Sequence, residues 1–273
     1  MRISRRVLCW VVGLAMLSTS CGRPAEHVSA PRVPSQRASE PVERLTKPTR
    51  AALAAPVDPD LRVGPIFLDG GTLHVCTGSV VHSAAGDLVM TAAHCLAGGS
   101  QITFAPGFAG DAAPSDLWTA DTVYLDPRWT AAKDPHADYA VMRVRNQGGG
   151  GSVESHVGLA LKLGQMPAPG SDVTVLGYPS GIGGTPVGCQ TSTQVSESGY
   201  PSVVCEGLVA GTSGGPWVSG TTITGLTGGL EGGGCAEDVS YSAPFDQRVA
   251  QLLARAEAGG PGDTVPNGVA DSC

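Results

Sequence analysis

Residues 91–95 read Thr-Ala-Ala-His-Cys and follow a short run of apolar residues. Two further segments belong with this one. Asp138 stands directly before residues 139–144, which read Tyr-Ala-Val-Met-Arg-Val, and residues 211–216 read Gly-Thr-Ser-Gly-Gly-Pro. The chain therefore carries a histidine, an aspartate and a serine in that order, each beside a segment with the character of a strand or a tight turn.

These three residue types support nucleophilic catalysis. A serine hydroxyl is a weak nucleophile until a neighbouring base takes its proton, and an imidazole with a pKa of about 6.5 can accept that proton and release it later. A carboxylate on the other ring nitrogen orients the imidazole. We therefore expect Ser213 as nucleophile, His94 as base and Asp138 as orienting group. The flanking glycines allow the N–H groups of Gly211 and Ser213 to point at one oxyanion.

From Leu61 onward, short apolar runs recur between turns rich in Gly, Pro, Asp and Ser. Many of these runs contain β-branched residues, and their close spacing predicts a β-barrel or a β-sandwich. Only the end of the chain differs. Residues 245–256 have the apolar spacing of a helix, with one stripe formed by Val249, Leu252, Leu253 and Ala256. We expect an all-β domain that ends in a helix.

Residues 61–257 resemble the trypsin/chymotrypsin-fold serine peptidases, in particular their secreted bacterial branch. The resemblance rests on the three segments quoted above, which stand in the order that the family has them. It implies two six-stranded antiparallel β-barrels with a boundary near residues 160–170, the first supplying His94 and Asp138 and the second Ser213. It also implies an endopeptidase that hydrolyses peptide bonds of proteins or peptides through an acyl-enzyme, with no cofactor.

The composition restricts the possible partners. The chain has 273 residues, of which 41% are hydrophobic and 15% charged, as expected of a globular protein. The net charge is −7, but residues 61–273 alone carry 8 basic and 19 acidic side chains. A domain this acidic is poorly suited to bind nucleic acid or an anionic membrane. We expect a monomer that contacts a membrane only through a lipid on Cys21, if one is attached.

The N-terminal residues 1–21 have the plan of a secretory signal, with a basic start and an apolar run at residues 7–17 that is too short to cross a bilayer. Paired arginines leave the Sec and the twin-arginine export routes both open. Cys21 resembles the lipidated cysteine of a lipoprotein signal, although Ser18 stands where a large aliphatic residue is usual. Residues 22–60 are interpreted as a disordered linker or propeptide, and residues 258–273 as a C-terminal tail.

Six cysteines remain after those of the leader, and an even set in an exported chain predicts disulfides: Cys76, Cys95, Cys189, Cys205, Cys235 and Cys273. The family resemblance implies a bond between Cys76 and Cys95. For the other four, we favour the most local pairing, Cys189–Cys205 with Cys235–Cys273, over an alternative that contains Cys205–Cys235. No metal site is expected, because no cysteine or histidine pairs have the spacing of zinc ligands. The histidines other than His94 are interpreted as structural.

Two positions depart from the trypsin-like members of the family. Gly207 stands where those members carry the aspartate at the floor of the specificity pocket, so a preference for basic residues is not expected. Thr212 replaces the aspartate that pairs with a newly cut N-terminus, so cleavage within residues 21–65 should not be needed for activity. The expected substrate-binding residues are Gly207, Thr227, Gly228, Gly229 and Leu230. These residues suggest an open cleft wall and predict no preference for a particular substrate side chain.

Two alternatives to an exported digestive endopeptidase are considered. One is a protease homologue without catalysis that acts as a binding module, which the intact His94, Asp138 and Ser213 set disfavours. The other is an envelope-tethered peptidase that processes one partner.

Overall fold

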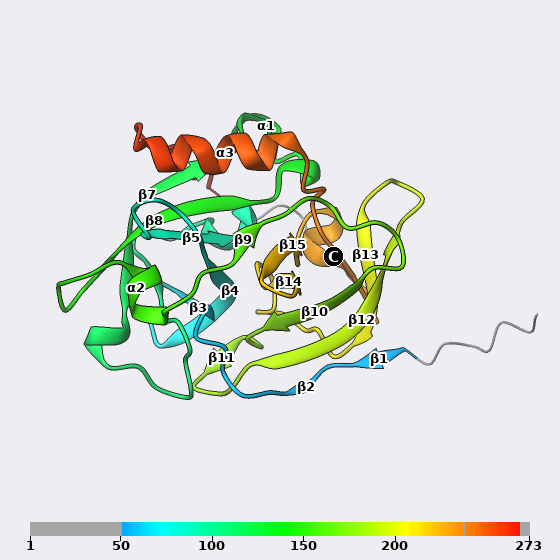
Figure 1. Ribbon diagram of the computed structural model, residues 1–273, viewed down its shortest axis with the longest axis horizontal. Helices are drawn as coiled ribbons and strands as arrows, with labels where there is room; N and C mark the ends of the chain where they lie inside the picture. Colours follow the sequence, from blue (N-terminus) through cyan, green and yellow to red (C-terminus); the bar gives the residue numbers. More distant parts are fainter. Residues whose placement is uncertain (1–50, 237, 268–273) are drawn as a thin grey trace, which may run out of the picture. The chain divides into compact units, whose positions relative to one another are not determined.

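The computed structural model describes residues 51–236 and 238–267. The predicted signal, Cys21, the linker up to residue 50 and the last six residues of the tail lie outside the described residues. Strands make up most of the described part (Figure 1). Within it, no helix combines the length and the apolar character that spanning a bilayer requires.

The first half of the described chain forms a closed six-stranded antiparallel barrel. Its strands are β3 (Val63–Leu68), β4 (Leu73–Val81), β5 (Leu88–Thr91), β6 (Ile102–Phe104), β7 (Trp118–Leu125) and β8 (Ala140–Asn146). They follow the order β4-β3-β6-β7-β8-β5, and pairing of β4 with β5 closes the ring. Leu88, Val89 and Met90 are all fully buried, which explains why this stretch is continuously apolar rather than alternating.

The second half forms a further sheet of mostly antiparallel strands. Its main strands are β10 (Asp172–Gly177), β12 (Val187–Val195), β13 (Pro201–Glu206), β14 (Pro216–Ser219), β15 (Thr222–Leu226) and β16 (Val239–Tyr241). β16 pairs with β13, and a bond from the N–H of Gly228 to the carbonyl of Tyr241 (2.9 Å) joins the end of β15 to β16. The prediction of a chymotrypsin-like pair of barrels is confirmed.

Two short strands lie at the edges of the two sheets. β9 (Lys162–Leu163) pairs with β15, and the preceding Leu161 forms a bridge with Val81 of the first barrel. β11 (Gly181–Ile182) extends the first sheet by pairing with β4.

The interpretation of residues 22–60 as a disordered linker is wrong for residues 51–60. β1 (Ala52–Leu53) pairs in parallel with β13, and β2 (Ala55–Pro56) pairs with β12. Each strand has only two residues, so no apolar periodicity could reveal it. Backbone hydrogen bonds, which leave no trace in composition, hold this segment against the second sheet.

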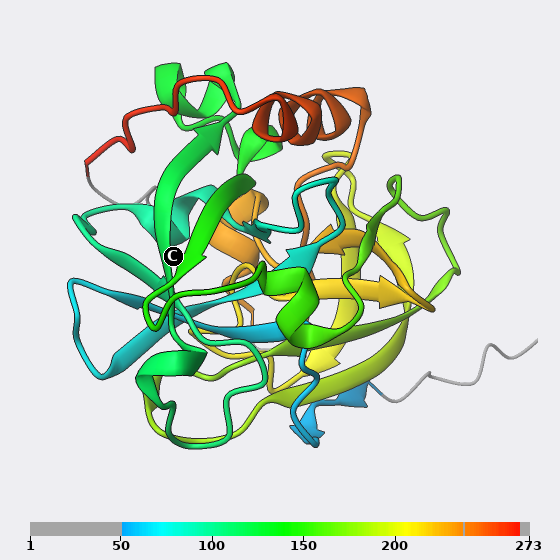
Figure 2. The same cartoon turned by 60° about the vertical axis from the view of Figure 1, so that its left-hand side comes forward.

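Helices occupy the surface of the barrels. The predicted C-terminal helix is α3 (Gln247–Ala258), with Val249, Leu252 and Ala256 buried. It lies over β7 and β8, where Figures 1 and 2 show it in red above the green strands. The shorter helices are α1 (Pro127–Ala132), α2 (Val153–Val157) and the 3₁₀ turns η1 (Ala93–Leu96), η2 (Pro114–Asp116), η3 (Pro135–Ala137) and η4 (Leu230–Gly233).

Candidate active site

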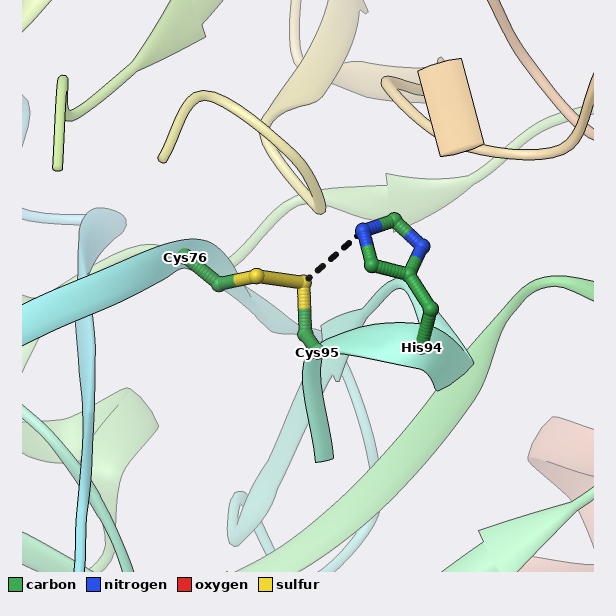
Figure 3. Close-up of side chains that lie close together, drawn as sticks. All are labelled: Cys76, His94 and Cys95. Carbon is green, nitrogen blue, oxygen red and sulfur yellow. Dashed lines mark hydrogen bonds between the residues drawn. A yellow bond between two sulfur atoms is a disulfide. The ribbon is translucent and has the colours of Figure 1, made fainter. Parts of the chain in front are cut away.

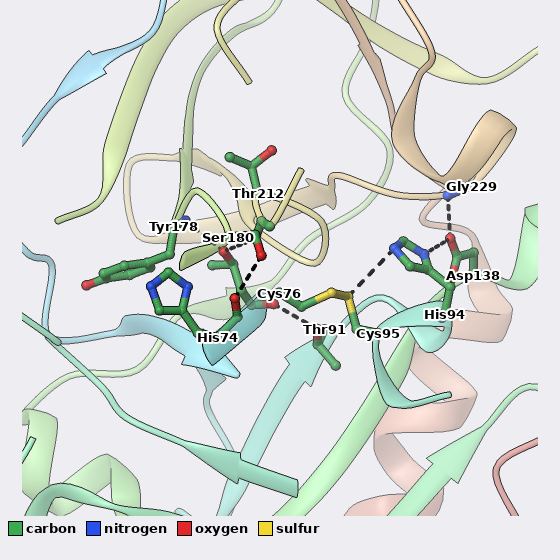
Figure 4. The surroundings of a disulfide bond; sticks show 12 residues. His74, Cys76, Thr91, His94, Cys95, Asp138, Tyr178, Ser180, Thr212 and Gly229 are labelled. Carbon is green, nitrogen blue, oxygen red and sulfur yellow. Dashed lines mark hydrogen bonds and ion pairs between the residues drawn. A yellow bond between two sulfur atoms is a disulfide. The ribbon is translucent and has the colours of Figure 1, made fainter. Parts of the chain in front are cut away.

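His94 lies in η1, directly after strand β5 of the first barrel. Its Nδ1 is 2.7 Å from Oδ2 of Asp138, and its backbone N–H donates to Oδ1 of the same carboxylate (2.9 Å). The His94 side chain is 15% exposed, whereas that of Asp138 is 1% exposed. The histidine therefore reaches the surface while its carboxylate partner is shielded from water. Figure 4 shows the dashed line that joins the His94 ring to Asp138 and the one that joins Gly229 to the same carboxylate.

Asp138 occupies a tight turn between η3 and β8. Its backbone angles, φ −77° and ψ 63°, are those of an inverse γ-turn, and the N–H of Tyr139 donates to the carbonyl of Ala137 (2.8 Å). A third donor reaches the carboxylate from the second barrel, because the N–H of Gly229 lies 2.8 Å from Oδ2. Buried carboxylates need such donors, and here two of the three are backbone groups.

The charges of the pair shift both pKa values. Burial raises the pKa of Asp138, but the neighbouring His94 and the backbone donors outweigh burial and lower it overall. Burial lowers the pKa of His94, but attraction to Asp138 outweighs this and raises it. Because the ionised carboxylate accepts a hydrogen bond from Nδ1–H, the Nε2 lone pair of neutral His94 is left to act as a base.

Ser213 lies in the loop between β13 and β14, and the first barrel holds this loop. The N–H of Thr77 donates to the carbonyl of Ser213 (2.8 Å), and Oγ1 of Thr77 donates to the carbonyl of Gly211 (2.9 Å). Gly211 has φ +93°, and a Cβ there would lie 2.1 Å from the backbone nitrogen of Ser180. Gly214 has φ +77°, and its Cβ would lie 2.2 Å from the carbonyl oxygen of Thr77. Only glycine fits either position.

The loop also orients two N–H groups. The carbonyl of Ala210 accepts from the N–H of Ser180 (2.7 Å), and the carbonyl of Thr212 accepts from the N–H of Gly215 (2.9 Å). Since the C=O and N–H of a trans peptide point in opposite directions, the N–H groups of Gly211 and Ser213 point away from these bonds. Within residues 51–236 and 238–267, neither N–H group donates to an acceptor. Both are therefore free to bind a developing oxyanion.

The two halves of the site are not directly bonded. No hydrogen bond joins Oγ of Ser213 to His94 in the described part of the chain. Nε2 of His94 instead lies 3.7 Å from Sγ of Cys95. Catalytic hydrogen bonds are often long before substrate binds and tighten in the reacting complex, so a serine and a histidine that are not yet bonded are compatible with a nucleophile–base pair.

The disulfide beside His94 joins Cys76 to Cys95 (Figure 3). The three side chains bring their ligand atoms within 4.8 Å of one another, but both sulfurs are used in the bond and offer no thiolate to a metal. The second disulfide joins Cys189 to Cys205. It rules out the alternative pairing of Cys205 with Cys235. The predicted pairing of Cys235 with Cys273 involves Cys273, which lies outside the described residues.

The expected substrate-binding residues lie beside Asp138 and the Ser213 loop. Thr227 is 4% exposed, and its Oγ1 accepts from the indole nitrogen of Trp217 (3.2 Å), so its side chain faces the interior. Gly228 lies so close to Asp138 that a Cβ at this position would come within 3.1 Å of Oδ2 of that carboxylate. Gly207 packs against Ala54 of the N-terminal segment. Gly229 donates to Asp138, as described above, and Leu230 begins η4.

Sequence reasoning missed two groups of this site. Gly229 was expected only as a substrate-binding residue, and the bond from its N–H to Asp138 was not foreseen. Thr77, which holds the Ser213 loop, was not considered at all. A backbone donor has no signature in the sequence. A single threonine after Cys76 is no different from many strand residues.

Comparisons with known proteins support the family and the fold. The family model described as a trypsin-like peptidase domain matches residues 76–224, a range that contains His94, Asp138 and Ser213. A sequence search of curated proteins finds no match.

Solved structures share the fold. The protease Anisep from Arthrobacter nicotinovorans is 22% identical, with a TM-score of 0.65 and coverage of 76% of this chain and 100% of that one. The thermostable serine protease AL20 from an extremophilic microorganism is 23% identical, with a TM-score of 0.63 and coverage of 74% and 99%. Human heparin binding protein is 14% identical, with a TM-score of 0.56 and coverage of 77% and 99%. At these identities the likeness concerns the fold alone.

Proposed function

This chain belongs to the trypsin-like peptidase family, and we propose that it is an exported serine endopeptidase acting on proteins or peptides through His94, Asp138 and Ser213. The observation that carries the proposal is the 2.7 Å contact between Nδ1 of His94 and the buried carboxylate of Asp138. A histidine held in this way has its second ring nitrogen free to act as a base.

The reaction would proceed in two halves. Oγ of Ser213 attacks the substrate carbonyl while Nε2 of His94 takes its proton, and Asp138 stabilises the imidazolium that forms. The N–H groups of Gly211 and Ser213 hold the oxyanion. His94 then gives the proton to the leaving amine, and the acyl group stays on Ser213. Water, deprotonated by His94, releases the acyl group and restores the serine hydroxyl.

We infer that no proteolytic cut is needed to order the Ser213 loop. Thr212 is 1% exposed, and both its N–H (3.0 Å) and its Oγ1 (2.8 Å) donate to the carbonyl of Val209. These local bonds support the loop without the ion pair that an aspartate would make with a new N-terminus. A precursor that is inert until cut near residue 50, with the trimmed protein active, would contradict this.

Export is supported by the plan of residues 1–21 and by the disulfides, because such bonds persist in oxidising compartments. Lipidation of Cys21 and the monomeric state remain predictions. Mass spectrometry of the mature chain tests the first, and sedimentation tests the second.

Labelling by a fluorophosphonate tests the catalytic proposal. We expect the folded, disulfide-intact protein to be labelled, Ser213→Ala to lose the label, and Ser219→Ala to keep it, since Ser219 is an exposed serine at the end of β14. Absence of labelling in the folded wild type would favour the alternative of a binding module. A cleavage profile on a peptide library then separates an endopeptidase from a peptidase confined to chain ends.

A further inference from the structure

We propose that Arg128, Asp126 and Tyr139 form a positioning network that holds the Asp138 turn. The inference rests on the proposed function, in which Asp138 orients His94. None of the three side chains belongs to the reaction described above, and yet Asp126 is 3% exposed and Tyr139 is completely buried.

The turn itself provides little to hold the carboxylate in place. An inverse γ-turn contains a single short-range bond, here from Tyr139 N–H to the Ala137 carbonyl. The bond that closes η3, from Asp138 N–H to the Pro135 carbonyl, is long at 3.4 Å. Besides the three donors to its carboxylate, the position of Asp138 therefore depends on what fixes the residues on either side.

After the turn, Tyr139 is the fixed point. Its hydroxyl donates to Oδ2 of Asp126 (2.7 Å) and accepts from Nη2 of Arg128 (2.9 Å). Asp126 and Arg128 are in turn joined by two hydrogen bonds, from Nε to Oδ1 (3.0 Å) and from Nη2 to Oδ2 (2.9 Å). Such a bidentate pair has a defined geometry, so the phenol is held in one position.

Before the turn, the same guanidinium reaches η3. Nη1 of Arg128 lies 3.9 Å from Oδ2 of Asp134, and Nη2 lies 3.5 Å from the carbonyl of His136. Asp134 also caps η3 by accepting from the N–H of His136 (2.9 Å). Arg128 thus contacts the chain on both sides of Asp138.

The charges in this region support an intact network. Burial raises the pKa of Asp126, but hydrogen bonds from Arg128 and Tyr139 lower it to about 2. Burial and the bond to Asp126 raise the pKa of Tyr139, and Asp246 at the start of α3 adds to this. At neutral pH the Tyr139 hydroxyl therefore stays protonated and can donate its hydrogen bond to Asp126. The Asp126 carboxylate stays ionised beside the guanidinium of Arg128.

The role of Asp126 as the cap of α1 does not explain its hydrogen bond with the Tyr139 hydroxyl. Asp126 caps the helix by accepting from the backbone N–H of Arg128 (2.8 Å), a bond that needs neither the guanidinium nor the phenol. The hydroxyl of Tyr139 can therefore be removed while the cap and the Asp126–Arg128 pair remain.

The test compares Tyr139→Phe with a matched control, Tyr124→Phe. Tyr124 is 1% exposed on β7 of the same barrel, and its hydroxyl donates to the carbonyl of Gly260 (3.0 Å). Tyr139→Phe loses two hydrogen bonds of a buried tyrosine hydroxyl and Tyr124→Phe loses one, but only Tyr139 is next to Asp138. The measurements are the rate constant and the affinity constant of fluorophosphonate labelling as a function of pH, with thermal unfolding to check the fold.

Displacement of a catalytic group by about 1 Å can cost about 100-fold, and a loosened turn should cost about tenfold. We expect Tyr139→Phe to label about tenfold more slowly with unchanged reagent affinity. We also expect the acid limb of the pH profile of its labelling rate to move to lower pH, because a displaced Asp138 raises the pKa of His94 less than the wild-type carboxylate does. Tyr124→Phe should label like the wild type.

If both variants label like the wild type over the pH range, the positioning role is wrong while the proposed function stands. If the wild type itself does not label, the proposed function fails and this inference fails with it. Should Tyr139→Phe not fold, Arg128→Lys is the second variant, because lysine keeps the charge but cannot make the bidentate contact. The same slowing and pH shift would support the network, and wild-type behaviour would overturn it.

Discussion

Thr77→Val tests how the first barrel holds the oxyanion loop of the second. Thr77 is completely buried in β4, and its hydroxyl makes two bonds, donating to the Gly211 carbonyl (2.9 Å) and accepting from the Tyr178 N–H (2.8 Å). Valine has nearly the same shape, so the change removes both bonds without opening a cavity. The backbone bond from residue 77 to the carbonyl of Ser213 remains.

The expected cost follows from these two bonds. A buried hydrogen bond contributes about 1 kcal/mol net, and a buried partner left unsatisfied costs about 1–3 kcal/mol. With two backbone groups left unpaired, Thr77→Val should lower the free energy of unfolding by about 2–6 kcal/mol. Loss of an oxyanion donor costs about 100- to 1,000-fold in kcat. Thr77 only orients the peptide after Gly211, so we expect a fall in kcat of about tenfold.

Urea unfolding and peptide hydrolysis measure the two effects separately. Thr193→Val is the control, because Thr193 is 2% exposed and donates to the carbonyl of Ala168 (2.8 Å) in the second sheet. It should lower stability and leave kcat unchanged. If Thr77→Val also loses only stability, with kcat equal to that of Thr193→Val, Thr77 does not orient the loop.

Three further outcomes are expected. The rate should fall as the pH drops through the pKa of His94, since the protonated ring cannot act as a base. Asp138 raises that pKa, so Asp138→Asn should move the acid limb of kcat/KM to lower pH. The same variant should lower kcat about 10⁴-fold. Replacing Cys189 and Cys205 together by alanine should cost about 3 kcal/mol in urea unfolding, as for a loop of about 15 residues, and an unchanged midpoint would contradict this. A chain that begins at Ala51 should keep full activity, whereas one that begins at Asp58 loses β1 and β2 and should show a lower Tm; equal Tm values would show that these strands add nothing.

The sequence predicted those parts of the site that depend on side-chain chemistry. His94, Asp138 and Ser213 stand in segments whose residue types have few other uses together, and this is why the fold could be predicted. The groups that hold them escaped prediction for a physical reason. Gly229 acts through its N–H, and Thr77 acts through a contact between barrels. Neither a backbone donor nor a long-range contact can be inferred from local pattern.

Asp126 shows the same limit in another form. An aspartate followed by proline is typical of a helix start or a turn, and it does cap α1. Its bonds to Arg128 and Tyr139 follow only once β7, α1 and β8 are placed beside each other. The role of Asp126 as a partner of Arg128 and Tyr139, in addition to its role as a helix cap, therefore has no sequence signal of its own.

The two halves of the site also depend on each other. The carboxylate of Asp138, in the first barrel, accepts a bond from Gly229 of the second, and the Ser213 loop, in the second barrel, is bonded to Thr77 of the first. Each barrel thus completes the catalytic groups of the other. A substitution that separates the barrels would displace the aspartate and the oxyanion donors at the same time, although neither barrel had unfolded. Under the proposed function, stability of the separate barrels is therefore not sufficient for activity, and the contacts between them belong to the proposed catalytic site as much as the triad does.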